Sequence, residues 1–429
     1  MKIKFYNRQF WVLALSMAFS FQFALAKEEF EEYDDDDEYT RLNPDEAQLA
    51  ESATEPENVK DTVPHSYLRR DLNKIQLNGD NWDELKNKLE QSRSHTSFTI
   101  VHVGDSHIQG DGGTGTTRGL FQKEYGDAGR GVIIPFKLAG TNEPRDYKIT
   151  TSAPLTIGKI MKRPWPVEMS FTGITLRPKT SDFTFDIGVK DNIGYFNILS
   201  SGSPEVVEVL SNGRPIQFST AQVKGGVEVY LDEDCSDLTV RMRGDDVNIF
   251  GFDLRNDNPG VIYHAVGNNG AAFASYNNID DFAPSLAALE PDLIILSMGG
   301  NEAFGNQSDE AFVGTIDTMV KNIREAMPTA KILITTPAEC MRSVAGGKGR
   351  GKSYQINRRV VHLRDLILEY GAANNIPTYD FYEVAGGDGS STKWVADKLL
   401  AADRIHRTWD GYTVDGTLVY EALRDALQK

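Results

Sequence analysis

The sequence is poor in cysteine and in clustered basic residues. Its 429 residues include only two cysteines, Cys235 and Cys340. Neither lies at a metal-binding spacing from a histidine, so we expect no zinc site. An oxidising compartment permits a disulfide between them, but the sequence does not establish the short Cα separation that a disulfide requires, and we expect two buried thiols. The net charge is −17, with no stripe of Lys and Arg. Nucleic-acid binding needs such a stripe. We expect no metal, no cofactor and no nucleic-acid partner; the charge disfavours polyanions and is compatible with neutral glycans.

Long hydrophobic runs are absent after the N-terminal residues. Three basic residues precede an apolar run at about 10–23, and Ala24-Leu25-Ala26 supplies small residues at a cleavage position. The run is short for a membrane span and contains polar residues. We predict a bacterial-type signal peptide over 1–26, a secreted or periplasmic protein, and no stable membrane span after cleavage.

The next segment, residues 27–64, has 15 acidic residues against 3 basic ones and few apolar side chains. Such a composition cannot bury enough surface to offset the entropy of ordering. The carboxylates of 34–37 are consecutive and lack the alternating spacing of a calcium loop. We predict an acidic disordered linker.

Two kinds of periodicity divide the remaining chain. Residues 146–256 alternate apolar and polar side chains between turn residues, which predicts an inserted antiparallel β-sandwich. Residues 65–145 and 257–429 alternate strand-like and helix-like segments, which predicts a mostly parallel sheet covered on both faces. The expected strands of the insert are 167–171, 182–188, 205–210, 227–231, 237–243 and 247–254. Around it we expect helices at 81–91, 282–289, 308–326, 354–374 and 414–427, and strands at 100–103, 261–266, 292–297, 331–336 and 378–381.

The chemistry of the chain centres on residues 99–110, TIVHVGDSHIQG. A buried strand ends at Gly104, which permits a sharp turn, and Asp105 and Ser106 follow. Ligands of open α/β sheets bind beyond the carboxyl ends of strands, where a serine exposes its hydroxyl. Taken alone, the same residues also suit a loop and a helix cap.

Four short blocks in order resemble the SGNH hydrolases, also called the GDSL family. In chain order the blocks are Gly104-Asp105-Ser106, 266–271 (VGNNGA), Gly299-Gly300-Asn301 after a strand, and Asp403-Arg404-Ile405-His406. The resemblance implies a flavodoxin-like three-layer α/β sandwich with a parallel sheet, here interrupted by an all-β, jelly-roll-like insert. GDSH followed later by GNEAF is similar to the branch of peptidoglycan O-acetyl esterases with a carbohydrate-binding-like insert.

The resemblance also implies a role for each block. Ser106 would be the nucleophile, His406 its base and Asp403 the residue that orients the imidazole. The oxyanion hole would combine the N–H groups of Ser106 and Gly270 with the amide of Asn301. In the second block Gly267 remains an alternative to Gly270.

Two residues depart from the family pattern, His107 in the first block and Glu302 in the third. Neither position carries a core catalytic role, and Glu302 is left without one. His107, His102 and His264 share no ligand spacing with acidic or cysteine residues, so we interpret all three as structural.

These features predict a secreted carbohydrate O-acetylesterase acting on peptidoglycan or a plant cell-wall glycan. The alternatives are a glycan-binding protein with a vestigial hydrolase domain, and a lipase or thioesterase of the same family. Fold analogy does not identify the polysaccharide, and the oligomeric state stays open.

Overall fold

The computed structural model describes residues 65–344 and 353–428. The predicted signal peptide and acidic linker lie outside these residues. No described helix combines the length and the apolar character that crossing a bilayer requires. Cys235 and Cys340 are free and buried, as expected.

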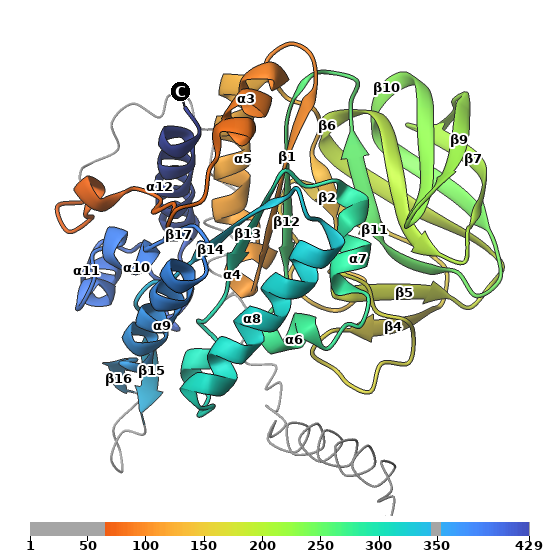
Figure 1. Cartoon of the computed structure of the whole chain (residues 1–429). Helices are drawn as coiled ribbons and strands as arrows, with labels where there is room; N and C mark the ends of the chain where they lie inside the picture. The colour runs from red at the N-terminus through yellow and green to blue at the C-terminus, as the bar shows by residue number, and fades with distance from the viewer. Residues whose placement is uncertain (1–64, 345–352, 429) are drawn as a thin grey trace, which may run out of the picture. The chain divides into compact units, whose positions relative to one another are not determined.

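A five-stranded parallel sheet forms the centre of the fold (Figure 1). Its order is β12 (Gly260–Gly267), β1 (Ser97–Gly104), β13 (Leu293–Ser297), β14 (Lys331–Thr335) and β17 (Thr378–Tyr379). Every neighbouring pair is parallel. Strands β1, β12 and β13 are buried along almost their whole length because both faces of the sheet are covered.

Helices cover both faces. On one face lie α3 (Asp83–Ser92), α5 (Gly112–Tyr125) and α12 (Trp409–Leu427); on the other lie α6 (Phe273–Asn277), α7 (Phe282–Leu286), α8 (Asp309–Ala326) and α9 (Arg359–Ala373). Alternate side chains of β1 face the two layers: Phe98 and Ile100 pack with α3 and α5, whereas Val101 and Val103 join the opposite core. The three-layer α/β/α sandwich predicted from the sequence is confirmed.

Short helices complete this part of the fold. They are η2 (Arg70–Leu72), α4 (Ser106–Gln109), η3 (Ala287–Leu289), η4 (Glu302–Phe304), α10 (Phe381–Val384) and α11 (Ser390–Ala396). Of these, α4 follows β1 directly, so the first sequence block lies at the carboxyl edge of the sheet.

A ten-stranded antiparallel sheet accounts for the all-β part of the chain (Figure 1). Its strands are β2 (Gly131–Ile133), β3 (Tyr147–Thr150), β4 (Leu155–Lys159), β5 (Ile174–Pro178), β6 (Asp182–Ser201), β7 (Glu205–Ser211), β8 (Arg214–Pro215), β9 (Phe218–Val223), β10 (Gly226–Arg243) and β11 (Asn248–Arg255). The long strands β6 and β10 pair over most of their length, with register shifts between Tyr230 and Asp237.

The two sheets share one apolar core. The largest buried cluster contains Phe185 and Phe252 of the antiparallel sheet together with Val101 of β1 and Phe312 of α8. Strand β2, which precedes residue 146, pairs with β11. The insert is therefore packed onto the hydrolase-like part through continuous apolar surface.

Several predicted elements differ from the structure. Residues 167–171 are not a strand, although Val167 and Met169 are buried. The backbone N–H of Phe171 bonds to the Ser285 hydroxyl at 3.3 Å instead of to a sheet partner. The expected strands 227–231 and 237–243 are one strand, β10, which continues through its bulges.

The predicted helix at 354–374 also begins too early. Its first residues form β16 (Ser353–Ile356), which pairs with β15 (Met341–Val344) in a separate hairpin. Conversely, α12 begins at Trp409, five residues before the prediction, because the Thr408 hydroxyl accepts the N–H of Gly411 and caps the helix.

Candidate active site

Ser106 occupies the first position of α4, immediately beyond β1. Asp105 caps this helix, and its Oδ1 accepts the N–H of His107 at 2.9 Å. A Cβ on Gly104 would lie 2.7 Å from the carbonyl oxygen of Ser297, so the chain turns where β1 and β13 pack too closely for a side chain. This turn places the Ser106 hydroxyl at the carboxyl edge of the parallel sheet.

His406 and Asp403 lie in the loop before α12 and meet Ser106 there. Nδ1 of His406 is 2.6 Å from Oδ2 of Asp403, and Nε2 is 2.8 Å from Oγ of Ser106. Because the carboxylate can only accept, Nδ1 carries the proton and Nε2 is free to accept from the serine hydroxyl. Ser106 thus joins one hydrogen-bonded series with His406, which lies 300 positions later in the chain, and with Asp403.

The loop itself holds Asp403 in position. Its Oδ1 accepts the N–H groups of Ile405 at 2.9 Å and His406 at 3.0 Å. Arg404 adopts a positive φ of 65°, which closes the turn. Both oxygens of Asp403 are therefore committed, one to the backbone and one to the imidazole.

The local charges favour a basic imidazole. Burial lowers the pKa of His406, but the hydrogen bond and charge of Asp403 outweigh burial, so the net pKa lies above its usual value. For Asp403, burial opposes ionisation, and the hydrogen bond and charge of His406 overcome it, so its pKa lies below the usual range. Each group stabilises the charged form of the other.

Asn301 reaches the first block from the loop after β13. Its side-chain amide donates to the carbonyl oxygen of Ala271 at 2.9 Å and to Oδ2 of Asp105 at the longer distance of 3.3 Å. Burial raises the pKa of Asp105 to about 6. The structure thus brings Asn301 beside the residue that precedes Ser106.

The two glycines of the second block have different surroundings. A Cβ on Gly267 would lie 2.3 Å from the backbone nitrogen of Gln109, so this glycine allows β12 to pack against α4. Gly270 is exposed, with φ of +77°, and its N–H donates no hydrogen bond to any described residue. Gly270 has the free donor, whereas Gly267 serves close packing.

Glu302 connects two loops beneath the site. Its two carboxylate oxygens accept the N–H groups of Phe273 and Gly299, both at 2.9 Å. Burial raises its pKa to about 7. Its position joins the loop that carries Asn301 to the start of α6, next to the second block.

The other histidines lie apart from any metal-like cluster. His102 bonds to the hydroxyls of Tyr263 and Ser297, and His264 accepts the N–H of Val132 at 3.0 Å. Among residues 65–344 and 353–428, no group of three His, Cys, Asp or Glu side chains is arranged to hold a metal ion.

His107 differs from these two because it lies against the proposed base. Its ring centre is 5.2 Å from that of His406, and its Nδ1 is 3.1 Å from the hydroxyl of Tyr412. Burial lowers the pKa of His107 to about 3, so it is neutral beside His406.

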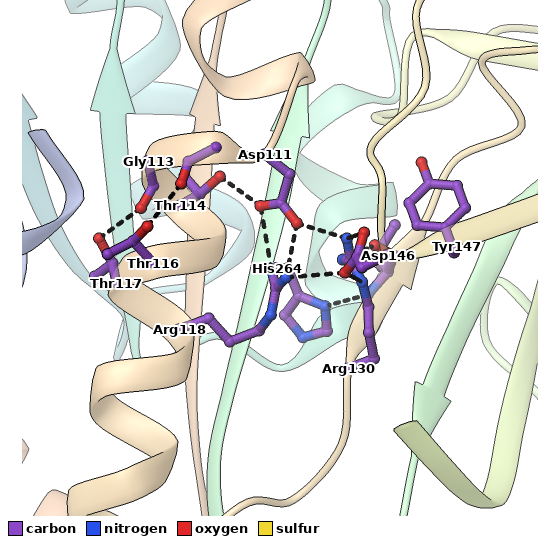
Figure 2. A network of polar contacts seen from close by, with 12 residues as sticks. Asp111, Gly113, Thr114, Thr116, Thr117, Arg118, Arg130, Asp146, Tyr147 and His264 are labelled. Atoms are coloured by element: carbon purple, nitrogen blue, oxygen red, sulfur yellow. Dashed lines mark hydrogen bonds and ion pairs between the residues drawn. The ribbon is translucent and has the colours of Figure 1, made fainter. Parts of the chain in front are cut away.

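A buried ion network supports the helix that follows the site (Figure 2). Asp111, the residue before α5, accepts from Arg118 at 2.7 Å and from Arg130 at 2.6 Å. Arg130 also bonds to Asp146 at 2.9 Å. Asp111 and Arg130 are almost completely buried. The network joins α5 to the segments on either side of β2, where the antiparallel sheet begins.

The connection between β4 and β5 borders the second block. Asn268 donates from its side chain to the carbonyl oxygen of Thr172 at 3.0 Å. A Cβ on Gly270 would lie 3.5 Å from the methyl carbon of Met161. A hollow of about 720 Å³ lies between this connection and the loop after α6. Its lining includes Trp165 and Asp280.

The sequence of residues 246–414 matches the model of the GDSL-like lipase/acylhydrolase family. This part of the chain is a GDSL-like hydrolase domain. The match begins just before β11, the last strand of the antiparallel sheet, so Ser106 lies outside it. The hydrogen bond to His406 connects Ser106 to the matched region. The recognition of an SGNH/GDSL hydrolase from four blocks is confirmed, and with it a hydrolase that acts on esters.

Solved structures extend the likeness of the fold beyond this GDSL-like domain. A structure titled "Peptidoglycan O-acetylesterase in action" is 22% identical, with a TM-score of 0.66, and the match covers 82% of this chain and 97% of that one. Coverage of this extent exceeds the α/β part of the chain and therefore extends into the antiparallel sheet. A lipase/acylhydrolase from Enterococcus faecalis is also 22% identical, but covers 39% of this chain and 77% of its own, with a TM-score of 0.29. A comparison with curated protein sequences finds no match.

Two contacts beside the site have no signal in the sequence. The contact between Asp105 and Asn301 joins two blocks whose residues were each named, but their spacing in sequence carries no sign of it. Tyr412 and His107 meet because α12 passes the start of α5, which only the fold determines.

Proposed function

We propose that this chain is a secreted serine esterase that removes O-acetyl groups from a polysaccharide. The hydrogen-bonded series from Ser106 through His406 to Asp403 carries the proposal. A serine hydroxyl needs a base to become a nucleophile, and the imidazole within 2.8 Å of it is held in the tautomer that accepts its proton.

The reaction would pass through an acyl-enzyme. Oγ of Ser106 attacks the ester carbonyl carbon while Nε2 of His406 takes its proton. The imidazolium, stabilised by Asp403, then returns the proton to the leaving sugar hydroxyl as the ester C–O bond breaks. A water molecule, activated by the same imidazole, attacks the acetyl-serine, releases acetate and restores the serine.

Three donors would stabilise the oxyanion: the N–H groups of Ser106 and Gly270 and the amide of Asn301. The free N–H of Gly270 supports this assignment over Gly267, whose backbone packs against α4. Asn301 would reach the oxyanion by giving up its longer hydrogen bond, the one to Asp105 at 3.3 Å.

The proposal that the substrate is an acetylated polysaccharide is supported by the fold as a whole. The solved structure that matches 82% of this chain with a TM-score of 0.66 carries the name peptidoglycan O-acetylesterase. Its likeness to this chain extends into the antiparallel sheet. Secretion is supported by the N-terminal sequence pattern. We place the protein outside the cytoplasm, acting on peptidoglycan or a plant cell-wall glycan without a cofactor.

The test is acetate release from O-acetylated peptidoglycan and from acetylated xylan by the mature protein and by Ser106→Ala. Removal of the nucleophile should lower turnover on the order of a millionfold. Release that continues undiminished in Ser106→Ala would contradict the proposal. Glycan binding by the wild type without any acetate release would favour a glycan-binding protein with a vestigial hydrolase domain. A preference for long acyl chains over acetyl would favour a lipase or thioesterase.

A further inference from the structure

Exposed apolar side chains gather around the proposed catalytic residues. Five large apolar residues are exposed among those described, and three of them border the site: Met161, Tyr354 and Trp409. Met161 lies against Gly270 of the second block. The other two are aromatic and flank the loop that carries His406. Each of the three therefore lies on or against a segment that carries a residue of the proposed site.

Trp409 is the first residue of α12, three positions after His406, and is 41% exposed. The guanidinium carbon of Arg145 lies 4.3 Å from the centre of its ring. The segment with Arg145 borders the site, because the neighbouring Asn142 accepts hydrogen bonds from Gln109 at the end of α4 and from Asn269 in the second block.

Tyr354 repeats this arrangement on the β15–β16 hairpin. It is 36% exposed, and the guanidinium carbon of Arg404 lies 5.7 Å from its ring centre. Arg404 stands between Asp403 and His406, and the N–H of Met341 in the hairpin bonds to its carbonyl oxygen at 3.0 Å. Trp409 and Tyr354, the two exposed aromatic residues at the rim of the site, therefore each have an arginine against their ring.

Neither arginine is neutralised. Among the described residues, no carboxylate lies within ion-pair distance of Arg145 or Arg404. The acidic residues beside them in sequence are engaged elsewhere: Asp146 with Arg130, and Asp403 with His406. A guanidinium stacked on a ring keeps its in-plane N–H groups available, and these suit a carboxylate.

We propose that Arg145 with Trp409 and Arg404 with Tyr354 form a subsite for carboxylate-bearing glycans. The inference rests on the proposed esterase function and narrows its substrate. The aromatic rings provide apolar faces for the sugar rings, and the arginines bind carboxylates of the same polymer. Two guanidinium groups without a carboxylate partner favour a glycan that carries carboxylates over a neutral one, although the chain as a whole has a net charge of −17.

The test compares each acetylated polymer with a matched form that lacks free carboxylates. Solubilised O-acetylated peptidoglycan and acetylated glucuronoxylan are used as prepared and after amidation of their carboxylates, which leaves the acetyl esters in place. The two polymers distinguish carboxylates on peptide stems from those on sugar rings. The wild type should show about tenfold higher kcat/KM on the carboxylate form of at least one polymer, as one charge-assisted hydrogen bond can provide.

Variants assign this preference to the rim. Arg145→Gln should remove most of the preference for the carboxylate form by raising the KM for that form. Arg145→Lys should keep part of the preference because a cation remains. Trp409→Ala should raise KM for both forms. Tyr230→Ala is the matched control, since Tyr230 is also 41% exposed but belongs to β10 and stacks on Tyr195; its kinetics should equal those of the wild type.

The outcomes separate the subsite from the esterase function. Equal kcat/KM on free and amidated polymers, with release that still requires Ser106, would overturn the subsite and leave the esterase intact. A carboxylate preference that Arg145→Gln retains in full would also overturn it. The esterase proposal itself fails if no form of either polymer yields acetate that depends on Ser106.

Discussion

At the scale of single residues, the proposed site depends on one carboxylate with two functions. One oxygen of Asp403 holds the loop by accepting two backbone N–H groups, and the other orients His406. The same contact raises the pKa of the imidazole, so the base is tuned by the residue that positions it. Replacing the carboxylate with an amide tests both functions, because turnover reports how His406 is held and the pH–rate profile reports its basicity.

We expect Asp403→Asn to lower kcat on 4-nitrophenyl acetate by about a thousandfold to ten-thousandfold, because an amide no longer holds the reactive tautomer. The base acts only when unprotonated, so wild-type activity is lost as the pH falls through the raised pKa of His406. Without the carboxylate that pKa falls, and the acidic limb of the pH–rate profile should move to lower pH. Asp410→Asn, which alters an exposed carboxylate four residues from His406, is the control. An unchanged acidic limb in Asp403→Asn would contradict the assignment.

At the scale of elements, α5 and α12 approach closely behind the site. A Cβ on Gly416 would lie 2.2 Å from the carbonyl oxygen of Gly113, and one on Gly112 would lie 2.9 Å from Tyr412. The hydroxyl of Thr117 also donates to the carbonyl oxygen of Gly416 at 3.0 Å. The glycine-rich stretch after Ser106 is therefore a helix surface shaped for contact with α12, which carries the residues next to His406.

Gly416→Ala should destabilise the protein by about 2 kcal/mol or more, because the clash is with backbone and the helices must separate. The free energy of unfolding in urea measures this effect. Gly314→Ala is the matched control in α8: its added Cβ meets no atom within 4 Å, so helix propensity should stabilise it by up to about 1 kcal/mol. Equal effects of the two substitutions would show that close packing of α5 and α12 is unimportant.

At the scale of the whole folded region, two sheets of different kinds share one core and one buried ion network. Arg130 is 2% exposed and joins Asp111 at the start of α5 to Asp146 before β3. Arg145 of the proposed glycan subsite is next to Asp146 in the chain, so the network holds part of this subsite in place. The ion network therefore contributes to the stability of the fold and also to the position of a residue proposed to bind substrate.

We expect Arg130→Met to destabilise the fold by about 3–5 kcal/mol, since it leaves the buried carboxylate of Asp111 with less compensation. Thermal or urea unfolding measures the loss. Arg241→Met, which breaks an ion pair on the surface of the antiparallel sheet with Asp182, should have little effect because solvent screens that pair. A loss at Arg130 no larger than at Arg241 would mean that the network contributes no more than a surface pair.

Much of the fold was predictable from sequence because local patterns are physical requirements. Strands buried on both faces are largely apolar, so β12 and β13 were predicted to within one residue of their ends. The centre of β1 was also predicted, although this strand begins three residues earlier than expected. Helix α8 showed its apolar stripe directly. Residues 167–171 alternate apolar and polar side chains as a strand would, yet the N–H of Phe171 bonds to the Ser285 side chain and not to a neighbouring strand. A hydrogen bond of this kind depends on the tertiary structure and leaves no pattern in the sequence.

The sequence by itself determined which residue types the site contains. Ser106, Asn301, Asp403 and His406 stand in blocks whose order and local turns can be read along the chain, because each block follows the end of its own element. Only the tertiary structure decided their mutual distances, the free N–H of Gly270 and the arginines on Trp409 and Tyr354. These contacts join segments up to 300 residues apart, and such contacts depend on how the two sheets and their helices pack.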